Sequence, residues 1–219
     1  MKYNIIPVQT VKATGAKLYT YILDNFEEID SNRTRPLVLI CPGGGYEFTS
    51  DREAEAVAVQ YIARGFHACV LRYSVAPAEF PQSLCELAWS VAYLREHAKE
   101  YGIKPDKIIV SGFSAGGHLS ASLGTLWNSS YLKSIFGKTE IYRPNGLILS
   151  YPVITSGQFR HEGSIESIIG KNPDNAMLEL VSLEKQVTPD TPKTFIWHCA
   201  DDGLSLIHIS EPTRHSLIS

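Results

Sequence analysis

Short, almost continuously apolar runs recur along the chain and alternate with stretches of helical periodicity. The apolar runs lie at Pro36–Cys41, His67–Tyr73, Lys107–Val110, Gly146–Val153 and Lys193–Cys199. A strand that is apolar on both sides belongs in a parallel sheet whose two faces are covered by helices. The chain is therefore predicted to have an α/β fold with a mostly parallel sheet. A further strand predicted at Tyr19–Asp24 allows an antiparallel hairpin at the N-terminal edge.

Three segments between these runs are predicted to be helices. Ser50–Arg64 begins with Ser50 and has Glu53 three residues later, the pattern of a capping box. Gln82–Tyr101 carries apolar residues at helical spacing and is predicted as one long amphipathic helix. Ala115–Trp127 follows the third apolar run after residues 111–114. No repeat or low-complexity linker interrupts this order, and 219 residues suit one domain.

Charge and hydropathy exclude two classes of partner. A net charge of -3 argues against a protein that holds nucleic acid mainly by positive charge. No apolar run approaches the roughly 18 residues that a membrane helix needs, and the first ten residues lack the pattern of a signal peptide. We therefore expect a cytoplasmic protein with no nucleic-acid and no membrane partner.

The four cysteines are predicted to be buried thiols. Cys41, Cys69, Cys85 and Cys199 each lie in an apolar stretch, and no two form a CxxC pair. Disulfides or metal ligands are the less favoured interpretations. We expect no metal and no cofactor.

Gly112-Phe113-Ser114-Ala115-Gly116 lies between the strand Lys107–Val110 and the following helix. This is the G-x-S-x-G pattern of a nucleophile elbow, in which a tight turn leaves no room for side chains at the glycine positions. The turn would present Ser114 at the carboxyl edge of the sheet and the Ala115 N–H at a helix start. The alternative is a glycine-rich turn with a buried capping serine.

A second motif, Pro42-Gly43-Gly44-Gly45-Tyr46, follows the strand Pro36–Cys41. Three consecutive glycines let backbone N–H groups approach a ligand atom, which an oxyanion hole requires. A phosphate-binding loop is disfavoured, because no Lys-Ser/Thr follows and Phe48 and Ser50 occupy positions where a dinucleotide motif needs glycine.

An acidic pair ends the last predicted strand. Asp201 and Asp202 follow Lys193–Cys199, and the order Ser then Asp or Glu is that of the hydrolase triad. Taken alone, the pair reads as a solvated turn. Together with the elbow and the glycine loop, it is a candidate triad acid, and either aspartate could fill the role.

These motifs resemble the α/β-hydrolase family of small carbohydrate esterases related to the hormone-sensitive-lipase group and to the feruloyl/acetyl-xylan esterases. The residues that carry the resemblance are PGGGY (Pro42–Tyr46), SDREAE (Ser50–Glu55), LRYSVAPAEFP (Leu71–Pro81), GFSAGGHLSASLGTLW (Gly112–Trp127), LILSYPVI (Leu147–Ile154) and WHCADD (Trp197–Asp202). The resemblance implies the α/β-hydrolase fold and hydrolysis of short acyl esters on carbohydrate, with a small-molecule or oligosaccharide ester as substrate.

By the same resemblance, Ser114 is the nucleophile, Gly44, Gly45 and Ala115 supply the oxyanion N–H groups, and Asp202 orients the catalytic histidine. Pro42 stands where the lipase-like relatives usually have histidine. A peptidase or a general carboxylesterase of the same fold is the enzymatic alternative. A binding protein with a degenerate hydrolase fold is the non-enzymatic one.

The triad histidine is expected to be missing. His118 lies on the helix after Ser114, where a packing role is expected, and the segment beyond Asp202 is too short for the crossover that precedes the histidine turn. Leu204–Arg214 (LSLIHISEPTR) matches the translation of a transposon-based sequencing adapter. We therefore assign residues 1–203 to an incomplete hydrolase domain without its last strand and helix, and 204–219 to an artefact. The chain is expected to be inactive.

Val153–Lys185 is longer than an ordinary connection between strands. It is predicted to bring Gln158, Phe159 and His161 to the carboxyl side of the sheet, where open α/β sheets bind ligands. We therefore expect it to shape the pocket for the acyl or sugar group.

Overall fold

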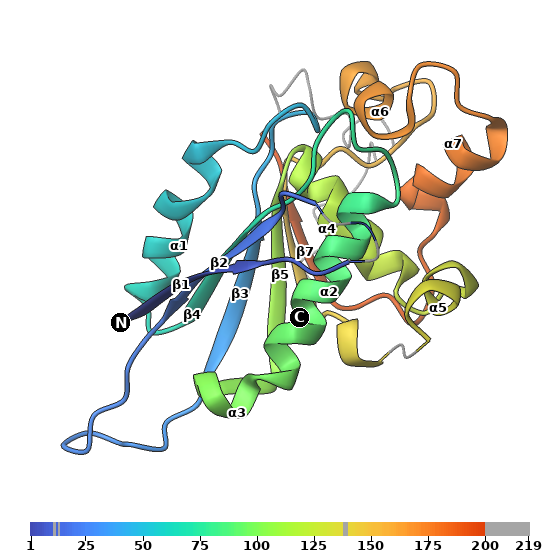
Figure 1. Cartoon of the computed structure of the whole chain (residues 1–219). Coiled ribbons are helices and arrows are strands. Elements are labelled where there is room, and N and C mark those ends of the chain that lie inside the picture. The colour runs from blue at the N-terminus through green and yellow to red at the C-terminus, as the bar shows by residue number, and fades with distance from the viewer. Residues whose placement is uncertain (11, 13, 138–139, 200–219) are drawn as a thin grey trace.

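A seven-stranded sheet runs through the middle of the molecule (Figure 1). The computed structural model describes residues 1–10, 12, 14–137 and 140–199. The strands are β1 (Lys2–Pro7), β2 (Lys17–Ile22), β3 (Arg35–Cys41), β4 (His67–Arg72), β5 (Ile103–Phe113), β6 (Gly146–Ser150) and β7 (Thr194–Trp197), in the spatial order β1-β2-β4-β3-β5-β6-β7. β1, β2 and β4 pair antiparallel, whereas β4, β3, β5, β6 and β7 are parallel. The predicted α/β class and the N-terminal antiparallel hairpin are confirmed.

The alternation of side chains along β3 divides the core between the two faces of the sheet. Leu37, Leu39 and Cys41 contribute to the larger apolar cluster, which α2 (Gln82–Glu96) and α4 (Ala115–Leu126) cover. Val38 and Ile40 point to the opposite face, where they pack against α1 (Glu55–Ile62). Because successive side chains of a strand point to opposite faces, a run that is apolar at every position needs both covers.

The remaining helices are short and lie mostly around the ends of the sheet (Figure 1). They are α3 (Ala98–Tyr101), α5 (Ser130–Phe136), α6 (Glu162–Ile169) and α7 (Asn175–Val181), with 3-10 turns at Asp51–Glu53, Glu140–Tyr142 and Leu183–Lys185. Among the described helices, none is long and apolar enough to cross a membrane.

Two of the predicted helices differ from the observed ones. The predicted Gln82–Tyr101 helix is interrupted at His97, where α2 ends and α3 begins. The predicted capping box is wrong, because the Ser50 side chain makes no capping hydrogen bond and Ala54 separates the first turn from α1. Glu53 instead accepts hydrogen bonds from Gly43 and Tyr151. The strand predicted at Lys107–Val110 is longer than expected and extends from Ile103 to Phe113.

Three of the four cysteines are buried thiols as predicted, but Cys199 is exposed. It follows β7, a strand whose side chains are all exposed and which, within the described residues, pairs only with β6. The apolar run Lys193–Cys199 therefore lacks the cover that the other parallel strands have.

Backbone packs directly on backbone where α4 meets β3. A Cβ atom added to Gly116 would lie 2.1 Å from the carbonyl oxygen of Cys41 and 2.4 Å from that of Pro42. Glycine at this position therefore lets the first turn of α4 approach the end of β3, where the glycine loop begins.

We predict that Gly116→Ala lowers the free energy of unfolding by at least about 2 kcal/mol. Helix propensity alone favours alanine by about 1 kcal/mol, but the added methyl group would collide with carbonyl groups that cannot rotate away. Urea unfolding measures the change. Gly15→Ala is the matched control, because a Cβ there meets nothing within 4 Å, and equal stability of the two variants would contradict the prediction.

Candidate active site

Ser114 occupies the turn between β5 and α4 with a positive backbone angle, φ 51° and ψ -117°. A non-glycine residue adopts such a conformation only where the surrounding structure enforces it. Here the Ser114 N–H donates to the Ser150 carbonyl oxygen at 3.1 Å, and its own carbonyl accepts from the Val153 N–H at 3.1 Å. The end of β6 thus holds the turn, as a nucleophile elbow requires.

The glycine loop follows β3 and lies against the Ser114 turn. A Cβ on Gly43 would come within 3.0 Å of the Ser114 Cβ, and one on Gly44 would lie 2.2 Å from the Phe48 carbonyl oxygen. Gly44 and Gly45 have φ of 128° and 65°, values that favour glycine. Within the described part of the chain, the N–H groups of Gly44 and Gly45 donate to no protein acceptor.

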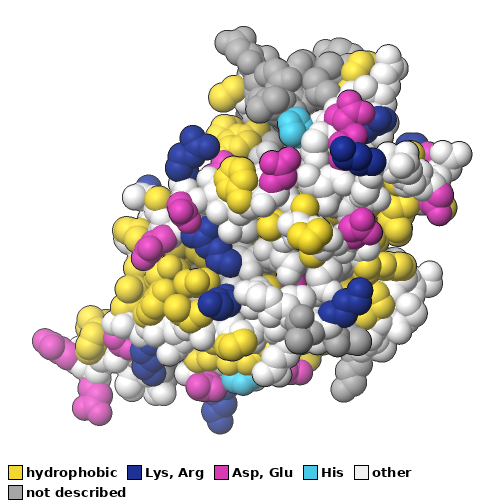
Figure 2. Space-filling view, turned by 45° about the horizontal axis from the view of Figure 1, so that its top comes forward, with side chains coloured by type: hydrophobic (Ala, Val, Ile, Leu, Met, Phe, Trp, Pro, Cys, Tyr) yellow, Lys and Arg dark blue, Asp and Glu magenta, His cyan; other side chains and the backbone are white. Residues whose placement is uncertain are grey.

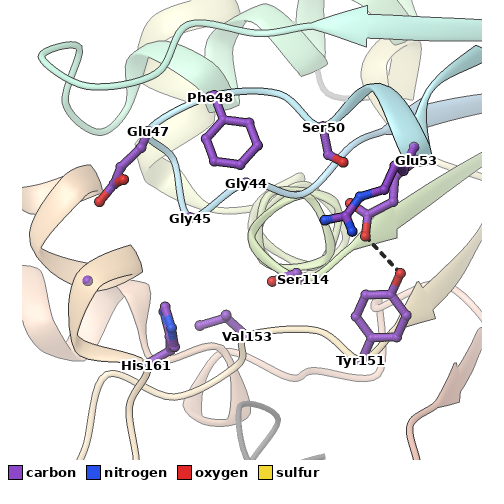
Figure 3. Close-up of a pocket in the computed structure, with 12 residues that line it drawn as sticks. Gly44, Gly45, Glu47, Phe48, Ser50, Glu53, Ser114, Tyr151, Val153 and His161 are labelled. Atoms are coloured by element: carbon purple, nitrogen blue, oxygen red, sulfur yellow. Dashed lines mark hydrogen bonds between the residues drawn. The ribbon is translucent and has the colours of Figure 1, made fainter.

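A pocket of about 700 Å³ opens where β3, β5 and β6 end (Figure 3). Ser114 lies at its base, and Phe48 and His161 stand on opposite walls in this view. The lining residues are Gly44, Gly45, Glu47, Phe48, Ser50, Arg52, Glu53, Ser114, Tyr151, Val153, His161 and Gly163. The carboxyl ends of parallel strands are where α/β sheets bind ligands.

Glu53 is a pocket residue that the sequence analysis missed. Its Oε2 accepts the Gly43 N–H at 2.7 Å, and its Oε1 accepts the Tyr151 hydroxyl at 2.8 Å (Figure 3). One carboxylate therefore ties the glycine loop to the residue that follows β6. The acidic run SDREAE contained the signal, but its spacing also fits a capping box, and only the tertiary contacts separate the two roles.

The connection after β6 reaches the pocket partly as predicted. Val153, His161 and Gly163 line it, whereas Gln158 and Phe159 are exposed and are absent from the lining. The first turn of α6 also lies next to the glycine loop, because a Cβ on Gly45 would be 3.8 Å from the Ser164 Oγ.

Of the remaining predicted site residues, Ala115 lies within the described ranges and Asp202 does not. Ala115 is buried at the first position of α4, directly after Ser114. His208 and His215, the two histidines that follow Asp202 and that are not expected to serve as the triad base, also lie outside the described residues. No histidine ring in the described ranges hydrogen-bonds to the Ser114 side chain, although the His118 backbone N–H donates to the Ser114 carbonyl oxygen at 3.1 Å. The acid and base of a triad therefore stay predictions.

His118 is a packing residue, as expected. It is buried on α4, and its ring nitrogens contact the Tyr46 hydroxyl and the Val181 carbonyl oxygen, both at 2.9 Å. It thereby links the glycine loop to the end of α7. Burial lowers its pKa to about 4, despite the hydrogen bond to Val181 that opposes the shift.

The BD-FAE family model matches residues 23–217. The chain belongs to the BD-FAE family. The match covers Ser114, the glycine loop and Asp202. It also runs over most of 204–219, so the domain boundary at residue 203 stays a prediction.

Two proteins similar to this chain have names that refer to xylan. The chain is 36% identical to endo-1,4-beta-xylanase B of Butyrivibrio fibrisolvens over 78% of this chain and 27% of that protein. It is 28% identical to an acetylxylan esterase of Xylanibacter ruminicola over 89% of this chain and 41% of the relative. The chain thus spans less than half the length of these two relatives.

A solved structure also matches closely. The acetyl ester-xyloside bifunctional hydrolase from Caldicellulosiruptor lactoaceticus superimposes with a TM-score of 0.79 and 32% identity, over 92% of this chain and 76% of that one. The α/β-hydrolase fold inferred from the motifs is therefore confirmed. Among the described residues, no group of three or more His, Cys, Asp or Glu side chains is placed to hold a metal ion.

We predict that the free energy of unfolding falls as the pH is lowered from about 6.5 to 4. His67 and His118 are both buried, and burial lowers the pKa of each from 6.5 to about 4. In this window the unfolded chain takes up protons that the folded protein refuses, so folding loses stability. The loss is on the order of 2 kcal/mol per histidine at pH 5.

Urea unfolding at pH 7 and pH 5 measures this loss, and NMR of the two imidazole rings supplies the control. Both rings should remain neutral in the folded protein at pH 5. Protonation of either ring near pH 6.5 would contradict the prediction for that residue.

Proposed function

We propose that this protein is a serine esterase that hydrolyses short acyl esters, acetyl above all, on carbohydrates. The observation that carries the proposal is the strained Ser114 turn facing a glycine loop whose Gly44 and Gly45 N–H groups have no acceptor among the described residues. Family membership and the similarity to an acetylxylan esterase and an acetyl ester-xyloside hydrolase support the choice of substrate.

In the proposed reaction, the Ser114 hydroxyl attacks the ester carbonyl carbon and passes its proton to a histidine base. The N–H groups of Gly44, Gly45 and Ala115 stabilise the negative oxygen of the tetrahedral intermediate. The alcohol leaves with a proton from the base, and water then releases the acyl group from Ser114. Asp202 orients the base, which we expect beyond residue 203.

The visible surface and the pocket lining both mix polar and apolar groups. Figure 2 shows Lys and Arg side chains interspersed with Asp and Glu over the visible face, with no large area of one sign. Glu47, Arg52 and Phe48 all line the pocket, so polar and apolar groups of a substrate would both find partners.

We predict that Ser114→Ala abolishes both labelling by a fluorophosphonate probe and hydrolysis of a short-chain nitrophenyl ester. Loss of the nucleophile should lower kcat by at least about 10⁴-fold. The assay uses the chain extended past residue 203 by the uninterrupted gene sequence that we propose in place of residues 204–219. Labelling that survives the substitution would refute the assignment of Ser114.

The 219-residue chain is the comparison in the same assay, and we expect it to release no acetate. Turnover by this chain would show instead that His208 or His215 completes the triad, and it would contradict the assignment of 204–219 to an artefact.

Glu53 is proposed as a positioning residue for the oxyanion loop. Glu53→Gln keeps the shape of the side chain, but its amide group can accept only one of the two hydrogen bonds from Gly43 and Tyr151. We predict that kcat falls roughly 10- to 100-fold with little change in KM, because the loop N–H groups lose their alignment with the transition state.

Tyr151→Phe is the matched control, since it removes the hydroxyl that donates to Glu53 and leaves the Glu53 carboxylate on Gly43. Its kcat should stay within a few-fold of the original. A Glu53→Gln variant that lowers the melting temperature but not kcat would show that Glu53 has only a structural role.

A further inference from the structure

His161 both caps a helix and lines the pocket. It is the N-cap of α6, where its Nδ1 accepts the Ser164 N–H at 3.3 Å and contacts the Ser164 hydroxyl at 2.8 Å. It also lines the pocket that contains Ser114. The imidazole ring is half-buried, so one edge is fixed by the helix and the other is available to the pocket.

The cap determines which ring nitrogen carries the proton. A backbone N–H can only donate, so the Nδ1 that receives it has no hydrogen, and a neutral ring then bears its hydrogen on Nε2. No residue in the described part of the chain accepts a hydrogen bond from this Nε2. His161 therefore offers the pocket a single donor of fixed direction.

The donor is held in register with the glycine loop. Ser164 is buried, and its hydroxyl oxygen lies beside Gly45 as well as beside the His161 ring. The position of the imidazole relative to Gly45 is therefore set by packing within the first turn of α6. A substrate bound at Ser114 would meet the loop N–H groups and the imidazole N–H at fixed places.

The acetyl group of an ester has one carbonyl oxygen, which cannot satisfy every N–H donor in the pocket. The proposed function assigns the carbonyl oxygen to the N–H groups of Gly44, Gly45 and Ala115. A further donor on the opposite side of the pocket from Phe48 (Figure 3) then needs an oxygen from the alcohol part of the substrate. The hydroxyl groups of a sugar supply such oxygens, and the Phe48 ring, 56% exposed, supplies an apolar wall for the sugar ring.

We propose that His161 determines specificity for carbohydrate esters by donating its Nε2–H to a hydroxyl oxygen of the sugar. This inference rests on the proposed function and names the residue that distinguishes a sugar ester from a simple alkyl ester. His161 takes no part in proton transfer to or from Ser114 in this proposal, because its Nδ1 is occupied by the cap.

The test measures binding, which does not require a complete triad. In a Ser114→Ala background that cannot turn over the ligand, NMR titration gives the Kd of an acetylated methyl xyloside and of ethyl acetate. Adding His161→Asn keeps a good N-cap residue but removes the imidazole donor. We expect the Kd for the xyloside to rise roughly three- to tenfold, as for loss of one hydrogen bond, and the Kd for ethyl acetate to stay unchanged.

Two further measurements separate recognition from stability. Asp174→Ala removes the corresponding cap of α7, where the Asp174 carboxylate accepts the Met177 N–H at 2.7 Å outside the pocket. It should lower the melting temperature and leave both Kd values unchanged. At pH 8, ¹⁵N NMR of the His161 ring should show a hydrogen on Nε2 and none on Nδ1.

Each contrary outcome identifies what fails. An equal rise in both Kd values would mean that His161 binds the ester group itself, and a hydrogen on Nδ1 would mean that the donor points elsewhere. An unchanged xyloside Kd, or no xyloside binding at all, would also overturn the inference. If the xyloside binds through His161 but the extended protein hydrolyses no ester, the proposed function fails and the sugar site stands.

Discussion

The approach of three backbone segments without intervening side chains is the constraint on which the site depends. The end of β3, the turn at Ser114 and the end of β6 contact one another through carbonyl and N–H groups, and Gly116 permits the closest of these contacts. A single methyl group at this point would displace either the serine turn or the glycine loop. The strained φ of Ser114 persists because these neighbours leave the turn no alternative.

Three side chains then hold this arrangement in place. Glu53 joins Gly43 to Tyr151, and His118 joins Tyr46 to Val181. Ser164 packs beside Gly45. Each contact brings together segments that are distant in sequence, so the glycine loop is fixed by the whole carboxyl edge of the sheet. Preorganised donors of this kind need no rearrangement as negative charge develops on a substrate oxygen.

The connection Val153–Lys185 supplies one wall of the pocket. Its residues Val153, His161 and Gly163 form one wall, and α6 orients the imidazole through its own cap. In the proposed function, the core beneath this wall cleaves the ester, and the wall meets the part of the substrate that differs between esters. Variation in such connections changes specificity while the sheet and the serine turn stay the same.

The sequence by itself determined the fold class, the serine turn and the glycine loop, because these depend on local patterns: continuous apolar runs and glycines at positions that tolerate no side chain. It did not determine the role of Glu53, whose spacing from Ser50 fits a helix cap equally well, nor the break of the long helix at His97. It also placed Gln158 and Phe159 at the pocket with His161, although only His161 reaches it. Those outcomes depend on contacts between distant segments, where the folded chain decides which acceptor a hydrogen-bond donor finds.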